Sequence, residues 1–217
     1  MENSPKIPSP RVKRKDRAWN KGKAVGPKAA LSADQVKLIR NSLAAGKEWR
    51  DLALFGAAID TMLRAVDLLK LRVSDITDPS GAILDEFGLK QQKTGEPHRV
   101  ALSASTKAVL DTWLSIARKL PDDLVFTGLK APNLYRALSR RQYGQLVKKW
   151  ATLARVADPS LFSTHSLRRT RAAYVYEQTR NIEVVKTLLG QKTVASTSAY
   201  LNIDKKRALD IGRKYEL

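Results

Sequence analysis

The sequence has no cysteine and only two histidines among its 217 residues. Without cysteine, the chain can form neither disulfide bonds nor a zinc site with thiolate ligands, and two histidines give little support for any other metal site. No apolar run approaches the roughly twenty residues of a membrane-spanning helix, and the polar start MENSPKIPSP contains no secretory apolar segment. We therefore expect a protein with no metal and no membrane span that stays in the cytoplasm, where it is made.

Acidic residues are scarce relative to basic ones. The chain has 21 Asp and Glu against 40 Lys and Arg, which gives a net charge of +19. Such an excess of one sign opposes compaction by self-repulsion and indicates a polyanionic partner. A membrane surface is one such polyanion, but no basic amphipathic helix stands apart from the rest of the sequence. Nucleic acid is the favoured partner.

The first 30 residues differ in composition from the rest. They carry nine Lys and Arg against Glu2 and Asp16, contain four prolines, and show almost no apolar periodicity. A segment of this kind cannot bury enough apolar surface to fold alone. We interpret residues 1–30 as a flexible arm that binds DNA phosphates; the alternative is a solubilising tail or the remnant of a lost domain. Residues 31–217 are expected to form one folded domain.

The folded part shows mostly helical patterns and one pair of strands. Helical patterns cover residues 32–46, 49–61, 103–121 and 139–156. Ser32 begins a capping box, Gly46 closes that helix, and Pro121 is expected to end the third. Residues 82–102 contain two strand-like runs around a polar turn at 94–96, which predicts a hairpin. The expected fold class is mainly α with a small antiparallel β-hairpin.

Three short helices are predicted in the C-terminal block, residues 163–201. Thr164 is a candidate N-cap for a helix over residues 166–178. The apolar stripe of that helix consists of Leu167, Thr170, Tyr174 and Val175. Asn181 can cap a second helix that ends at Gly190, and a third segment covers residues 193–201. This arrangement brings His165, Arg168 and Tyr200 into one compact block.

The spacing in this block resembles that of the tyrosine recombinases, or phage-type integrases. Their signature is H-x-x-R, then L-G followed by His or Trp, and then a tyrosine nine residues later. Here the matching residues are His165 and Arg168, Leu189-Gly190-Gln191, and Tyr200. Gln191 departs from the usual His or Trp: its amide can donate a hydrogen bond, but it has no charge and cannot shuttle a proton.

Three upstream residues extend the resemblance. Arg64 matches the first catalytic arginine of the family, which follows a buried helix, and Asp67 matches the acidic residue that accompanies it. Lys93, in the pattern Q-x-K-T-G, matches the catalytic lysine on a β-hairpin. The resemblance implies that Asp67 orients Arg64 through a charge-assisted hydrogen bond.

The resemblance also implies the chemistry of the site. Tyr200 would attack a DNA phosphodiester and form a 3′-phosphotyrosyl bond, so that no cofactor, metal or ATP is required. Arg64 and Arg168 would bind the non-bridging oxygens, with Gln191 as a weaker third donor. His165 would accept the tyrosyl proton or hold the phosphate.

Proton transfer to the leaving group would come from Lys93, which is expected to protonate the 5′-oxygen. The implied activity is that of a site-specific DNA recombinase, an integrase or invertase of a mobile genetic element. One alternative is type IB topoisomerase-like strand cleavage. Another is a non-catalytic DNA-binding relative, which Gln191 favours. An RNA-binding protein would explain the positive charge but not the order of the Arg, Lys, His, Arg and Tyr residues.

The resemblance covers residues 31–217 and includes no helical core-binding domain, as in the short single-domain DNA invertases of bacteria. Exchange of two duplexes needs four strand cuts, and each tyrosine makes one. We therefore expect a homotetramer on double-stranded DNA. The apolar residues Leu201, Ile203, Leu209 and Ile211 lie beside the nucleophile or in the tail, residues 204–217. The tail is expected to dock on a neighbouring subunit; the alternative is a helix folded back on its own domain.

Overall fold

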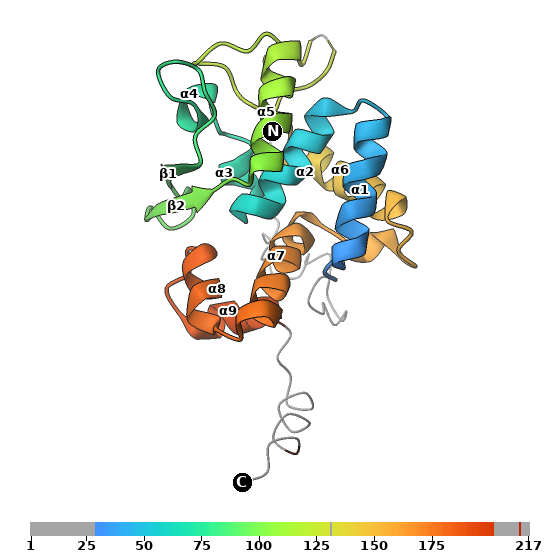
Figure 1. Ribbon diagram of the computed structural model, residues 1–217, viewed down its shortest axis with the longest axis vertical. Helices are drawn as coiled ribbons and strands as arrows, with labels where there is room; N and C mark the ends of the chain where they lie inside the picture. The colour runs from blue at the N-terminus through green and yellow to red at the C-terminus, as the bar shows by residue number, and fades with distance from the viewer. Residues whose placement is uncertain (1–28, 131, 202–212, 214–217) are drawn as a thin grey trace, which may run out of the picture.

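The computed structural model describes residues 29–130, 132–201 and 213 (Figure 1). The expected tail, residues 204–217, and the first 28 residues of the expected arm fall outside this range, apart from Arg213. The helices are α1 (Ala33–Ala45), α2 (Trp49–Thr61), α3 (Ala65–Leu68), α4 (Val73–Ile76), α5 (Ala104–Ile116), α6 (Arg140–Leu153), α7 (Thr164–Thr179), α8 (Ile182–Leu188) and α9 (Val194–Leu201), with a 3-10 helix η2 (Pro159–Leu161). The strands are β1 (Glu86–Lys90) and β2 (Pro97–Ala101).

Helix α2 is the centre of the main core. As its apolar sequence predicts, it is buried along nearly its whole length, and it packs against α1, α5 and α7. On its α6 side, the rings of Phe55 and Trp150 pack edge to face at a centroid distance of 5.3 Å. The predicted Ser32 capping box is confirmed at the start of α1, so local signals and the packing of the core agree.

The predicted hairpin is confirmed as a two-stranded antiparallel sheet. Phe87 of β1 pairs with Val100 of β2, and both side chains point into the core while their neighbours along each strand are exposed. This alternation anchors one face of the hairpin and leaves the turn projecting beyond the sheet. The turn carries Lys93.

The block of α7, α8 and α9 has a small core of its own, formed by Ala172, Val185, Leu189 and Leu201 together with Met62. Met62 ends α2 in a left-handed conformation with φ of 49°. It therefore joins the end of the central helix to the C-terminal block. Figure 1 shows this block, in orange, on one side of the molecule, with α8 next to the hairpin.

Several predicted details of the helices are wrong. The N-cap of α7 is Ser163, whose backbone N–H donates to Ser166 Oγ at 3.0 Å, and not Thr164, which is already helical. Tyr174 is 46% exposed, because the buried side of α7 is centred on Leu167 and Ala172. Helix α5 ends at Ile116, well before Pro121, because the chain turns at Arg118 with a positive φ of 49°.

Across the described residues, no helix is both long and apolar enough to cross a membrane.

Candidate active site

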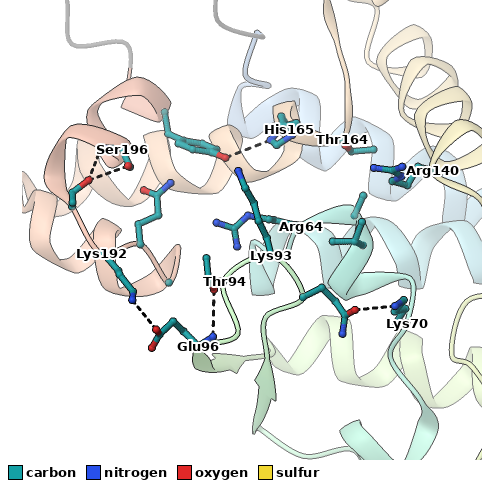
Figure 2. Close-up of a pocket in the computed structure, with 17 residues that line it drawn as sticks. Arg64, Lys70, Lys93, Thr94, Glu96, Arg140, Thr164, His165, Lys192 and Ser196 are labelled. Carbon is teal, nitrogen blue, oxygen red and sulfur yellow. Dashed lines mark hydrogen bonds and ion pairs between the residues drawn. The ribbon is translucent and has the colours of Figure 1, made fainter. Parts of the chain in front are cut away.

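A cavity of about 1020 Å³ lies where the hairpin turn, the start of α3, the N-terminus of α7 and the α8–α9 segment meet. Five of the six predicted catalytic residues line it: Arg64, Lys93, His165, Gln191 and Tyr200. They come from segments up to 136 positions apart in the sequence (200 − 64). The fold thus brings together residues that the sequence separates, and Figure 2 shows several of them around one space.

The cavity is strongly cationic. Besides Arg64 and Lys93, its lining includes Lys70, Arg140 and Lys192, whereas Glu96 is the one lining carboxylate among the described residues. Glu96 is paired with Lys192 at 2.7 Å between Oε1 and Nζ, and this contact holds the pKa of Glu96 below its usual value. A concave site with this charge balance attracts phosphate groups.

Tyr200 and His165 lie side by side at one edge of the cavity. Tyr200, near the end of α9, places its hydroxyl 3.4 Å from Nδ1 of His165, which lies in the first turn of α7. Partial burial lowers the pKa of His165, and the nearby charges of Arg168, Arg64 and Lys93 lower it further. The imidazole is therefore neutral at neutral pH, and in the tautomer with the proton on Nε2, Nδ1 is free to accept the tyrosyl proton.

Arg168 is placed differently from what was expected. It is 2% exposed and does not line the cavity; its Cζ lies 5.5 Å from the centroid of the Tyr200 ring. Nη1 donates to the carbonyl of Met62, and Nη2 donates to that of Leu189 at 3.3 Å. These residues cap α2 and α8, where carbonyls lack helical partners. Arg168 therefore packs against the ring of Tyr200 and bonds the carbonyls at the ends of both α2 and α8.

The expected pairing of Arg64 with Asp67 is wrong. Within the described part of the chain, Arg64 donates through Nη1 to Oε1 of Gln91 at 2.6 Å. The buried Asp67 instead accepts a hydrogen bond from the backbone N–H of Gln92 through Oδ1 at 2.8 Å. Asp67 therefore fixes the backbone at the end of β1, and Gln91 takes the place beside the arginine.

Lys93 lies in the β1–β2 turn, and Figure 2 shows it extending from that turn toward His165. Gln191 lines the cavity after the turn that ends α8. Its Oε1 accepts a hydrogen bond at 2.8 Å from the hydroxyl of the buried Thr197. With the oxygen engaged there, the amide nitrogen of Gln191 remains a donor for a ligand in the cavity.

Sequence reasoning missed Gln91, His98 and Thr197. Gln91 and His98 fill the space next to Gly190, which has a positive φ of 59°. A Cβ at Gly190 would overlap the Gln91 amide nitrogen and lie 2.8 Å from His98 Nδ1. His98 could have been found from the alternation of β2, since it shares the inward face with Val100. No comparable pattern marks Gln91 or Thr197.

Comparisons of the sequence and of the structure with known proteins both find integrases and tyrosine recombinases. The sequence model of the phage integrase family matches residues 29–207. The tyrosine recombinase XerC of Vibrio atlanticus is 27% identical over 158 residues, which cover 71% of this chain and 47% of XerC. The chain thus spans about half the length of the curated relatives that it matches.

Solved structures show the same fold. The crystal structure of XerA recombinase superposes with a TM-score of 0.69 at 18% identity, covering 87% of this chain and 66% of XerA. The XerH site-specific recombinase, solved bound to its palindromic difH substrate as a post-cleavage complex, gives 0.65 at 20% identity, covering 89% of this chain and 55% of XerH.

Proposed function

Because the chain belongs to the phage integrase family, we propose that it is a site-specific DNA recombinase that cuts and rejoins strands through a 3′-phosphotyrosyl intermediate. The observation that carries this proposal is the Tyr200 hydroxyl, 3.4 Å from His165 Nδ1 at the edge of a cationic cavity. Its test is the trapping of a covalent protein–DNA complex on nicked DNA, followed on a denaturing gel.

In the proposed reaction, the Tyr200 oxygen attacks phosphorus while the bond from phosphorus to the 5′-oxygen breaks. The tyrosyl proton passes to Nδ1 of His165, and Lys93 gives a proton to the leaving 5′-oxygen. Arg64 and the amide of Gln191 stabilise the negative charge on the non-bridging oxygens. Because the phosphotyrosyl bond retains the energy of the broken one, attack by a 5′-hydroxyl of a second strand reseals the DNA and releases Tyr200.

Arg168 has an indirect part in this proposal. Its guanidinium lies against the face of the Tyr200 ring and donates hydrogen bonds to the carbonyls of Met62 and Leu189. A cation in this position stabilises charge that develops on the phenolic oxygen. We therefore assign Arg168 to the nucleophile, and Arg64 to the phosphate.

The proposal predicts how cleavage depends on pH. His165 must be neutral to accept the proton, and its pKa lies below the ordinary value of 6.5. The cleavage rate is therefore expected to fall as the pH drops through this lowered pKa, and to be at its full value at neutral pH. Single-turnover cleavage rates measured across the acidic range test this, and His165→Gln should remove the dependence. A rate that rises toward acid pH would contradict the role given to His165.

For the arm, we propose binding to the DNA backbone outside the cavity. Leu31 is buried and its N–H donates to Thr170 Oγ1 at 2.9 Å, so a truncation that preserves the fold removes residues 1–28. Loss of these cations should weaken DNA binding and flatten its dependence on salt, because fewer counterions are released. Affinities measured at several salt concentrations check this expectation. An unchanged slope would leave the arm without a role in binding.

We further propose that four protomers act together on double-stranded DNA. The reaction supports this, since exchange of two duplexes needs four cuts and each Tyr200 makes one. The XerH structure was solved on a palindromic substrate, a DNA symmetry that matches paired protomers. The charge of +19 opposes self-association until DNA neutralises it, so assembly is expected only on DNA.

A further inference from the structure

Gln91 is a buried amide that contacts three segments of the active site. It lies just after β1 and is 2% exposed. Its Oε1 accepts hydrogen bonds from Arg64 Nη1 at 2.6 Å and from Thr94 Oγ1 at 3.0 Å, and its Nε2 donates to the carbonyl of Gly190 at 3.4 Å. One side chain thus connects the arginine, the turn that carries Lys93, and the residue before Gln191.

The partners of Gln91 determine the positions of the oxygen and the nitrogen of its amide. A guanidinium has only donors and a backbone carbonyl only accepts, so the oxygen must face Arg64 and the nitrogen must face Gly190. Methionine has neither group, and glutamate has no donor for Gly190 when ionised. Among side chains of this length, glutamine alone satisfies both contacts.

The surroundings of Gln91 give an independent indication. Residue 190 is a glycine, and any Cβ there would overlap the Gln91 amide nitrogen. The space beside the α8–α9 turn is therefore shaped around this amide. Because Asp67 bonds the backbone of Gln92 instead of Arg64, the hydrogen bond that orients Arg64 comes from Gln91.

We propose that Gln91 is a positioning residue for Arg64, holding its guanidinium in the geometry that meets the phosphate. This inference rests on the proposed function. Gln91 does not line the cavity and so acts through Arg64 and not on the DNA. Its contacts with Thr94 and Gly190 hold the amide from two other segments besides Arg64. A reacting geometry that is off by about 1 Å can cost roughly a hundredfold in rate.

The test is a double-mutant cycle on single-turnover cleavage of nicked DNA. Gln91→Met keeps the size of the side chain and removes both polar contacts. It is expected to slow cleavage by roughly ten- to a hundredfold, with DNA affinity unchanged. In an Arg64→Ala background the same substitution should slow cleavage less than about threefold, because its target is already gone. The exposed Gln145 on α6 provides a matched control, and Gln145→Met should cleave like the wild type.

Two outcomes overturn different claims. If Gln91→Met slows cleavage by the same factor with and without Arg64, its effect is general and the positioning role is wrong. If the wild-type protein forms no covalent complex, the proposed function fails, and with it any catalytic meaning of Gln91. Where Gln91→Met does not fold, Gln91→Ser serves in the same cycle, since its shorter side chain removes the contact with Arg64 but keeps a polar group in the site. The same non-additivity is expected for it, and additivity would overturn the proposal.

Discussion

Replacing Tyr200 with phenylalanine is expected to abolish covalent attachment to DNA while leaving DNA affinity nearly unchanged. The substitution removes the attacking oxygen and nothing else of the ring. The aromatic face over Arg168, at 5.5 Å from Cζ, and the packing of α9 against α7 both remain. The hydrogen bond to His165 is lost, but at 3.4 Å it is a weak contact in the unliganded protein. Covalent complex is measured on denaturing gels, and affinity by titration under native conditions.

Tyr174→Phe is the matched control for this prediction. Tyr174 lies on α7, the helix that carries His165, but its side chain is 46% exposed and lies away from the cavity lining. It should form covalent complex at the wild-type level. Persistence of the adduct in Tyr200→Phe would move the nucleophile elsewhere, and Tyr174, Tyr176 and Tyr215 would then have to be tested in turn.

Arg64→Ala should reduce cleavage by at least about a hundredfold, the scale observed when a preorganised donor to a developing negative charge is removed. Arg64 lines the cavity, and Gln91 holds its guanidinium through Nη1, which leaves other N–H groups for the phosphate. Arg168 is a less informative target, because it also satisfies the carbonyls of Met62 and Leu189. Replacing Arg168 would lower the stability of the fold as well as the rate of cleavage, and the two effects could not be separated.

The control for Arg64 is Arg99, on the outer face of β2. Arg99 pairs with Glu86 at 3.3 Å, and both side chains are exposed. Arg99→Ala removes the same charge from the same part of the protein without touching the cavity, and cleavage should stay close to the wild-type rate. Normal single-turnover cleavage by Arg64→Ala would instead make Arg64 a structural residue.

Much of the local structure could be predicted because it depends on nearby residues. Capping signals at Ser32 and Asn181 define helix starts, and both residues are N-caps in the structure. The hairpin follows from alternation around a polar turn. The mainly helical fold with a small antiparallel sheet is thereby confirmed, and the solved recombinases share it.

Contacts between distant segments could not be predicted in the same way. The family pattern indicated that Arg64 and Asp67 belong to one site, but three residues of separation do not determine which partner each side chain finds. The segment just after β1 reaches both side chains, so that Gln91 gives Arg64 an amide oxygen and Gln92 gives Asp67 a backbone N–H. Arg168 likewise finds helix-end carbonyls that only the packed fold brings near. Such partners depend on tertiary packing, which spacing alone does not reveal.

The central claim is that Tyr200 becomes covalently joined to the 3′ side of a cut DNA strand. It is tested most directly by incubating the full chain with a pooled library of nicked duplexes labelled at either end, then separating products in denaturant. The expected result is a protease-sensitive complex that carries the label of the fragment whose 3′-phosphate is joined to the protein. This complex should be absent with Tyr200→Phe. Binding without any such complex, or a complex joined to the 5′ side, would contradict the account.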